Sequence, residues 1–148
     1  MKVEVRPAVV EDEAFLESLF RLKASEDLGF APLDPLIDLQ VRARNRQFGG
    51  RFADPSAWLI EVDGARVGSY QLEPGQNRHL SYFAILPEYR GKGIGTEVLR
   101  RLQAEGGDIL LYVTPWNTAR KLYERMGFVV ERQEDASILM RWAASPVC

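Results

Sequence analysis

Residues 80–99 read LSYFAILPEYRGKGIGTEVL, and this stretch guides the interpretation of the rest of the chain. An apolar strand stops at Pro87, a turn with three glycines in five residues follows at 91–95, and a helix comes next. Because glycine has no Cβ, the backbone of such a turn can approach a ligand closely. The start of a helix presents unpaired N–H groups and a positive dipole end. With Arg90 and Lys92 in the same turn, the pattern predicts an anion site, best suited to phosphate.

Two common phosphate-binding patterns do not fit this turn. A Walker A loop requires Gly, four residues, Gly, Lys and then Ser or Thr, whereas Lys92 lies before the last two glycines. A dinucleotide fingerprint started at Gly91 would place Thr96 where its third glycine belongs. The next predicted strand, 109–113, is followed by Thr-Pro-Trp and offers no acidic residue for a ribose. Both classes are therefore excluded.

A third pattern, Arg/Gln-x-x-Gly-x-Gly/Ala, is met by Arg90, Gly93 and Gly95. Further along, residues 117–128 read NTARKLYERMGF. This segment is similar to N-x-x-A-x-x-x-Y-x-x-x-G-F, except that its alanine follows the asparagine by two places and not three. Together the two motifs resemble the acyl-CoA loop and the second signature of the GNAT superfamily of N-acetyltransferases. The resemblance extends over nearly the whole chain, although residues 25–55 match nothing firmly.

The resemblance implies an α/β (α+β) fold over a single acyl-CoA N-acyltransferase domain, residues 1–148. Its mixed, largely antiparallel central sheet has about six to seven strands flanked by about four helices. In that fold a parallel strand pair, here 80–86 and 109–113, splays apart and holds the pantetheine arm of the cofactor. From the sequence pattern the predicted strands are 3–6, 57–62, 65–72, 78–86, 109–113, 128–132 and 137–142. The predicted helices are 11–22, 36–48, 96–104 and 115–126, with turns over 25–35.

Composition narrows the functional class. The 148 residues are 46% hydrophobic and 27% charged, with a net charge of −2, which is typical of a globular domain. The acidic balance argues against a nucleic-acid partner. No apolar run approaches the roughly 20 residues of a membrane span, and the first residues carry no signal-peptide pattern. We therefore expect a cytoplasmic protein without a membrane partner. Its only cysteine, Cys148, is expected to be an incidental thiol.

The resemblance also implies which residues hold acetyl-CoA, the expected cosubstrate; no metal is predicted. The backbone amides of the turn would bind the pyrophosphate, with charge from Arg90 and Lys92. Strand residues 84–86 would pair with the pantetheine amides through their backbone. Asn117 is either a helix cap or turn residue, or a polar contact near the cofactor sulfur. The predicted cofactor-binding set is Ala84, Ile85, Leu86, Arg90, Gly91, Lys92, Gly93, Ile94, Gly95, Thr96 and Asn117.

The implied reaction is transfer of the acetyl group to a primary amine by direct attack in a ternary complex. Family resemblance makes Tyr123 the acid for the leaving thiolate; a phenol pKa near 10 against about 8.5 for a thiol allows this. For the general base, the residues leave His79 and Glu73 open, acting directly or through water. Alternatively, Tyr82 and Ser81 line a water channel, and many family members carry no dedicated base.

The acceptor amine is not identified by the sequence, and a homodimer stays open. Residues 25–55 are expected to form the acceptor side, because this is where the family varies. The arginines Arg42, Arg44, Arg46 and Arg51 could recognise an anionic acceptor, but we expect them to form the solvated face of a helix. The alternative function is a CoA-binding regulatory or sensor domain of the same fold that has lost catalysis.

Overall fold

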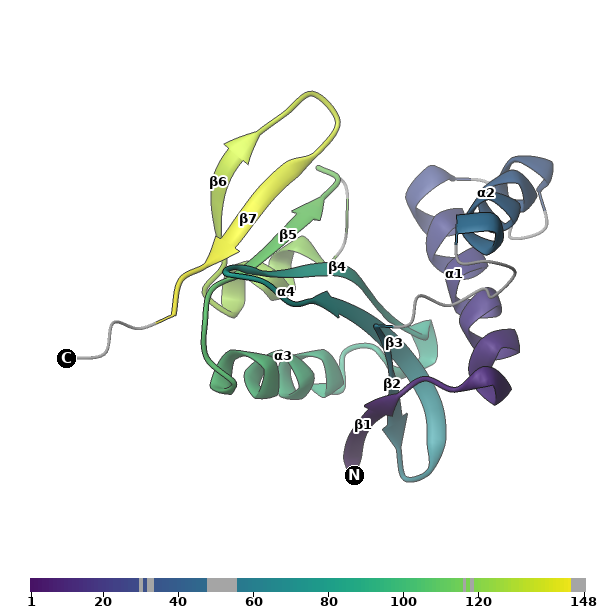
Figure 1. Ribbon diagram of the computed structural model, residues 1–148, viewed down its shortest axis with the longest axis horizontal. Coiled ribbons are helices and arrows are strands. Elements are labelled where there is room, and N and C mark those ends of the chain that lie inside the picture. Colours follow the sequence, from purple (N-terminus) through teal and green to yellow (C-terminus); the bar gives the residue numbers. More distant parts are fainter. Residues whose placement is uncertain (30, 32–33, 48–55, 116, 118, 145–148) are drawn as a thin grey trace. The chain divides into compact units, whose positions relative to one another are not determined.

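Seven strands form one hydrogen-bonded sheet in the order β1-β2-β3-β4-β5-β7-β6 (Figure 1). The computed structural model describes residues 1–29, 31, 34–47, 56–115, 117 and 119–144. The strands are β1 (Val3–Pro7), β2 (Ala57–Val62), β3 (Ala65–Glu73), β4 (Arg78–Ile85), β5 (Ile109–Val113), β6 (Val129–Gln133) and β7 (Ile138–Trp142). The helices in the described part are α1 (Glu13–Leu28), α2 (Pro35–Gln47), α3 (Ile94–Ala104) and α4 (Arg120–Arg125), with short 3₁₀ turns η1 (Val10–Asp12) and η2 (Pro87–Tyr89).

The mixed, mostly antiparallel sheet with four helices confirms the predicted fold class. The chain forms two compact units. The N-terminal unit comprises Met1–Gln71 and Tyr82–Tyr89, and the C-terminal unit comprises Leu72–Ser81 and Arg90–Cys148. Strands β3 and β4 contribute residues to both. The prediction of a single domain over 1–148 stays a prediction.

In the N-terminal unit, the β2–β3 hairpin turns at Asp63 and Gly64, as the Asp-Gly signal predicts. Both residues have positive φ, 50° and 84°, which is the backbone of a tight hairpin turn. Further along β3, Gly68 lies against β4. A Cβ added there would lie 2.5 Å from the carbonyl oxygen of Ala84. Only glycine permits this approach between the two strands.

The core of this unit is shared by α1, α2 and β2, which contribute Leu16, Ala24, Ile37, Val41, Ala57 and Leu59. The turn predicted from residue 25 was wrong for 25–28, because α1 continues to Leu28. Its apolar face carries on through buried Ala24 and the helix ends at Gly29, where φ is 76°. The predicted end of α2 at Phe48 and the pair Gly49-Gly50 lie outside the described residues.

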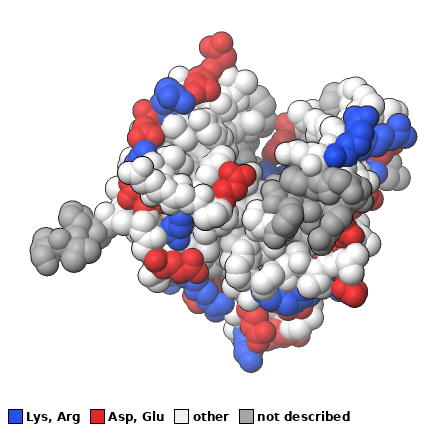
Figure 2. All heavy atoms as spheres, viewed as in Figure 1, with Lys and Arg blue, Asp and Glu red and all other residues white. Residues whose placement is uncertain are grey.

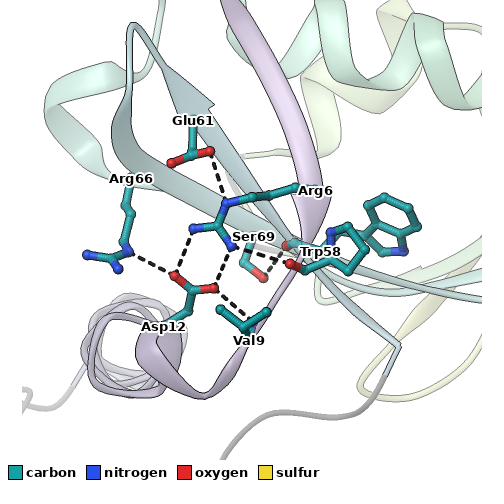
Figure 3. Close-up of polar contacts among 8 residues, drawn as sticks. Arg6, Val9, Asp12, Trp58, Glu61, Arg66 and Ser69 are labelled. Atoms are coloured by element: carbon teal, nitrogen blue, oxygen red, sulfur yellow. Dashed lines mark hydrogen bonds and ion pairs between the residues drawn. The ribbon is translucent and has the colours of Figure 1, made fainter.

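Asp12, at the junction of β1 and α1, is completely buried and fully paired (Figure 3). Its carboxylate accepts hydrogen bonds from both terminal nitrogens of Arg6, at 2.8 and 3.0 Å, and from Nε of Arg66 at 2.9 Å. The N–H of Val9 adds a fourth at 2.9 Å, while Arg6 also donates to Glu61 at 3.1 Å. The hydrogen bonds from Arg6 outweigh the effect of burial and hold the pKa of Asp12 well below its usual range.

In the C-terminal unit, β4 and β5 run parallel, and their ladder has two register pairs, Arg78–Ile109 and His79–Leu110. Both strands continue beyond these pairs, to Ile85 and Val113. The parallel pairing thus joins the first two residues of each strand. The sheet then continues antiparallel through β7 to the edge strand β6 (Figure 1).

Helix α3 begins at Ile94, two residues before the predicted start, and ends beside Arg78 at the first position of β4. The guanidinium of Arg78 donates to the carbonyl oxygens of Leu102 at 2.6 Å and Gly107 at 2.7 Å. It therefore adds a side-chain donor to the last turn of α3 and to the loop that follows it. The amide of Gln103 donates to the carbonyl of Met126 at 2.8 Å, which ties α3 to the end of α4.

Candidate active site

The Gly-rich turn before α3 exposes its backbone. Gly91 and Gly93 have φ values of 74° and 85°, and a Cβ on either would meet nothing within 4 Å. Gly93 is the N-cap of α3, and the N–H of Glu97 makes the bond to its carbonyl at 3.0 Å. The N–H groups of Ile94, Gly95 and Thr96 precede this first i→i−4 bond of the helix. These backbone donors and the positive end of α3 thus follow directly after the exposed residues Arg90 to Gly93.

The other turn residues anchor the helix. Ile94 and Gly95 are buried, and Thr96 is half-buried. Below them one face of α3 is buried through Val98, Leu99 and Leu102. The start of α3 is therefore anchored by its buried apolar face, while the glycines before it leave the backbone accessible.

The second motif also has a defined geometry, but not the predicted long helix. The prediction that this helix begins at 115–117 was wrong, because α4 runs only from Arg120 to Arg125. The carboxamide oxygen of Asn117 accepts the N–H of Ala119 at 2.8 Å, closing a turn ahead of the helix. Asparagine side chains compete with helical hydrogen bonds in this way. Asn117 therefore has its turn role here, while Trp116 and Thr118 lie outside the described residues.

Gly127 ends α4 in the left-handed conformation, with φ of 92°. The N–H of Phe128 donates to the carbonyl of Tyr123 at 3.0 Å, and the N–H of Gly127 donates to that of Glu124 at 3.1 Å. This is a Schellman motif, whose usual apolar contact is made here by the rings of Tyr123 and Phe128, 5.7 Å apart. Tyr123 is only 4% exposed. The motif Tyr-x-x-x-Gly-Phe thus fixes the tyrosine ring against the start of β6.

The two base candidates, His79 and Glu73, lie together. Nδ1 of His79 is 3.2 Å from a carboxylate oxygen of Glu73, and both side chains are partly exposed. The ring of His79 also meets Tyr112 of β5 edge-on, with ring centres 5.9 Å apart. When Nδ1 carries the proton, Glu73 fixes the imidazole and leaves Nε2 as a proton acceptor. The geometry is that of a carboxylate-oriented histidine.

The predicted pantetheine residues lie in the N-terminal unit, at the end of β4. Ala84 and Ile85 are buried and Leu86 is half-buried. The N–H of Leu86 donates to the carbonyl of Val67 at 2.8 Å, and its carbonyl accepts the N–H of Tyr89 at 2.9 Å. The N–H of Leu86 is therefore occupied, and only a second lone pair of its carbonyl is left for a ligand.

Sequence reasoning placed Arg44 on a solvated helix face, and this was wrong. Its guanidinium lies over the ring of Phe20, 5.1 Å from the ring centre, and over that of Tyr82 at 5.5 Å. The signal was present in the sequence, because Arg44 follows the buried residues Ile37 and Val41 at helical spacing. Arg42 and Arg46 are exposed as predicted, and basic side chains gather over α2 in Figure 2. Arg51 lies outside the described residues.

Comparison with known proteins agrees with the two motifs. A family model described as an acetyltransferase (GNAT) domain matches residues 53–130, which is more than half of the chain and includes both motifs. The chain belongs to this family of acetyltransferases. Mycothiol acetyltransferase of Rhodococcus jostii is 30% identical over 89 residues, which make up 57% of this chain and 29% of that protein. The match thus spans less than a third of that relative's length.

Solved structures share the fold over nearly the whole chain. PaiA N-acetyltransferase of Thermoplasma acidophilum, solved with coenzyme A, has a TM-score of 0.71 at 21% identity, covering 97% of this chain and 99% of that one. An acetyltransferase of Thermus thermophilus gives 0.72 at 20% identity, covering 97% of each chain. Spermidine N-acetyltransferase of Vibrio cholerae, solved with CoA and spermine, gives 0.67 at 19%, covering 96% and 95%.

Neither a membrane nor a metal site is indicated in the described part of the chain. None of its helices combines the length and apolar character needed to cross a membrane. Among the same residues, no three or more His, Cys, Asp or Glu side chains gather into a metal-binding group.

Proposed function

We propose that this acetyltransferase transfers the acetyl group of acetyl-CoA to a primary amine by direct attack in a ternary complex. The observation that carries the proposal is the exposed glycine turn capped by Gly93 at the start of α3. Coenzyme A carries a pyrophosphate, and a helix start with open backbone donors and two flanking cations suits that group. The relatives solved with coenzyme A support the same ligand.

In the proposed complex, the amides from Gly91 to Thr96 bind the pyrophosphate, with Arg90 and Lys92 adding charge. Ala84 and Ile85 pair with the pantetheine through their backbone. The carbonyl of Leu86 is a weaker candidate, because it already accepts one hydrogen bond. Asn117 keeps a proposed cofactor contact through its amide nitrogen, since its oxygen is used within the turn.

The reaction requires three proton movements: the nitrogen loses one proton before attack and a second as the amide forms, and the sulfur gains one. The amine nitrogen attacks the thioester carbon, a C–N bond forms, the C–S bond breaks, and coenzyme A leaves as a thiolate. We propose that the hydroxyl of Tyr123 protonates this thiolate and regains a proton, directly or through water, from the nitrogen that becomes the amide. A protonated amine cannot attack, so a base must first remove its proton, and we propose His79, oriented by Glu73, for this role, directly or through water. Steady-state kinetics of His79→Gln tests this base, because kcat/KM for the amine should fall when the proton acceptor is lost.

Two measurements test the function as a whole. Acetyl-CoA should raise the melting temperature of the protein by mass action, and ATP or NAD at equal concentration should raise it much less. Acetyl-CoA should then be consumed with at least one member of an amine library, with the acetylated product identified by mass spectrometry. An equal shift with NAD would contradict the cofactor assignment. Binding without turnover of any amine would favour the regulatory, non-catalytic domain.

A further inference from the structure

A separate polar pocket lies wholly within the N-terminal unit. Its lining comes from α1, α2 and the strands β2, β3 and β4: Leu16, Phe20, Arg44, Ala57, Ser69, Gln71 and Tyr82. The hydroxyl of Tyr82 is buried here and has no hydrogen-bond partner among the described residues. Burial raises the pKa of this phenol, which therefore stays a neutral donor. A buried hydroxyl without a partner is costly, which points to a ligand group or water that pairs with it.

Arg44 contributes a guanidinium group to the pocket. Arg44 lies over the stacked rings of Phe20 and Tyr82, whose centres are 6.4 Å apart. The neutral polar lining is buried, with Ser69 1% and Gln71 4% exposed, and no carboxylate lines the pocket among the described residues. Asp27 has an electrostatic effect on Tyr82, and its carboxylate is paired with Lys23 at 3.2 Å. An anionic group would find a guanidinium and a phenol donor there.

The position of Tyr82 relates the pocket to the proposed cofactor strand. Tyr82 lies two residues before Ala84 on β4. Residues two apart on a strand face the same side and are separated by about 7 Å. Tyr82, which lines the pocket, is therefore about 7 Å along β4 from Ala84, whose backbone is proposed to hold the pantetheine.

We propose that this pocket binds the carboxylate of the acceptor, so that the substrates are small amines that also carry a carboxylate, such as amino acids. The inference rests on the proposed function and names its substrate class. Arg44 and the hydroxyl of Tyr82 bind the carboxylate oxygens, and the amine points out of the pocket. A polyamine, such as the spermine bound to the Vibrio cholerae enzyme, would bring positive charge against Arg44.

Matched pairs of amines test the substrate class. Alanine, leucine and phenylalanine are each compared with the amine that lacks only the carboxylate: ethylamine, 3-methylbutylamine and 2-phenylethylamine. The expected result is that the carboxylate-bearing member of a pair has the higher kcat/KM by about tenfold or more, as for one charge-assisted hydrogen bond. Equal or better turnover of the decarboxylated amines would overturn this inference and leave the proposed function intact.

Variants assign the preference to the pocket. Arg44→Gln should abolish the preference within a pair while leaving KM for acetyl-CoA unchanged, and Tyr82→Phe should reduce it. Arg42→Gln is the matched control, because it removes the same charge from the exposed face of the same helix. A preference that survives in Arg44→Gln, or falls equally in Arg42→Gln, would contradict the proposal.

A direct binding measurement separates this inference from the proposed function. The two probes are N-acetylalanine and N-ethylacetamide, which differ by the carboxylate alone. N-acetylalanine should raise the melting temperature of the wild type but not of Arg44→Gln, whether or not any amine turns over. If neither probe, or both equally, stabilised the wild type, the pocket would hold water only and the inference would be wrong.

Discussion

Two helices of this protein begin beside basic side chains, and they differ in the residue at the N-cap, which is Asp12 for α1 and Gly93 for α3. At the start of α1 the chain supplies an anion, since the Asp12 carboxylate is buried between Arg6 and Arg66 (Figure 3). At the start of α3 the N-cap is Gly93, which has no side chain, and Arg90 and Lys92 are exposed. The first arrangement is complete within the chain and stabilises the fold. The second leaves open space at the N-cap, since a Cβ on Gly93 would meet nothing within 4 Å, and this suits the proposed binding of an anion from outside.

Tyr123 packs within the fold through its ring and is proposed to donate a proton through its hydroxyl, so Tyr123→Phe should have the largest effect. The ring packs against Phe128, so Tyr123→Phe should keep the fold and acetyl-CoA affinity. The proposed proton donor is lost, and kcat should fall about 10²–10⁴-fold. Steady-state kinetics with a good acceptor measures this, and Tyr70→Phe, another buried tyrosine, is the control. Unchanged turnover would reject Tyr123 as the acid, and a collapse in stability would leave it a packing role alone.

Breaking the α1 arrangement should affect stability and not chemistry. Asp12→Asn removes the charge that Arg6 and Arg66 pair with and places amide donors against guanidinium donors. We expect the free energy of unfolding to fall by about 3 kcal/mol, the lower end for breaking a buried pair, because both arginines reach solvent. Urea unfolding measures this loss, with exposed Glu11→Gln as control. An equal loss in both variants would show that the burial of Asp12 adds nothing.

The same carboxylate predicts how stability depends on pH. Because the pKa of Asp12 is lower in the folded protein than the roughly 3.9 of an unfolded chain, its contribution is present above that value. As pH falls, the unfolded chain takes up a proton that the folded protein does not, and stability is lost. The difference in unfolding free energy between wild type and Asp12→Asn should therefore shrink from about pH 5 downward. A pH-independent difference between pH 6 and pH 3 would contradict this.

The smallest expected effect distinguishes strain from ligand binding at α3. Gly93 and Gly106 flank this helix with φ of 85° and 88°, and a Cβ on either meets nothing within 4 Å. Alanine at either position should therefore cost a similar amount, about 1–2 kcal/mol. Only Gly93→Ala should also weaken stabilisation by acetyl-CoA, because its methyl group projects where the pyrophosphate would lie. Thermal shifts of both variants with acetyl-CoA test this, and equal shifts would refute the turn as the cofactor site.

The sequence pattern predicted the bounds of most helices and strands to within two residues, because apolar periodicity and turn residues act over a few neighbouring positions. The Asp-Gly hairpin and the strand 109–113 are examples, since one turn signal or one apolar run defines each. The Gly-Phe end of α4 was predicted for the same reason. The start of α4 was missed, because the side chain of Asn117 bonds to the backbone in competition with the helix.

Contacts between distant segments could not be predicted from local pattern. Asp12 lies within the predicted helix 11–22, yet its main partners, Arg6 and Arg66, come from two strands. His79 and Glu73 were separate candidates, and only the approach of β3 and β4 showed that they pair. The spacing of Arg44 after Ile37 and Val41 could have predicted that its side chain faces the core. Its contact with Tyr82 could not have been predicted, because the two residues are far apart in sequence.

The close approach at Gly68 has a consequence for the variation that this chain can tolerate. A single added carbon would lie 2.5 Å from a backbone oxygen that cannot move without shifting β4. Any selection for a folded protein should therefore keep glycine at position 68, even where catalysis is not selected. At Gly93 an added carbon meets nothing, so folding constrains this position only through its φ of 85°, and the use of acetyl-CoA should add a second constraint. Sequence variation at Gly68 would thus report on folding, and variation at Gly93 would also report on the use of acetyl-CoA.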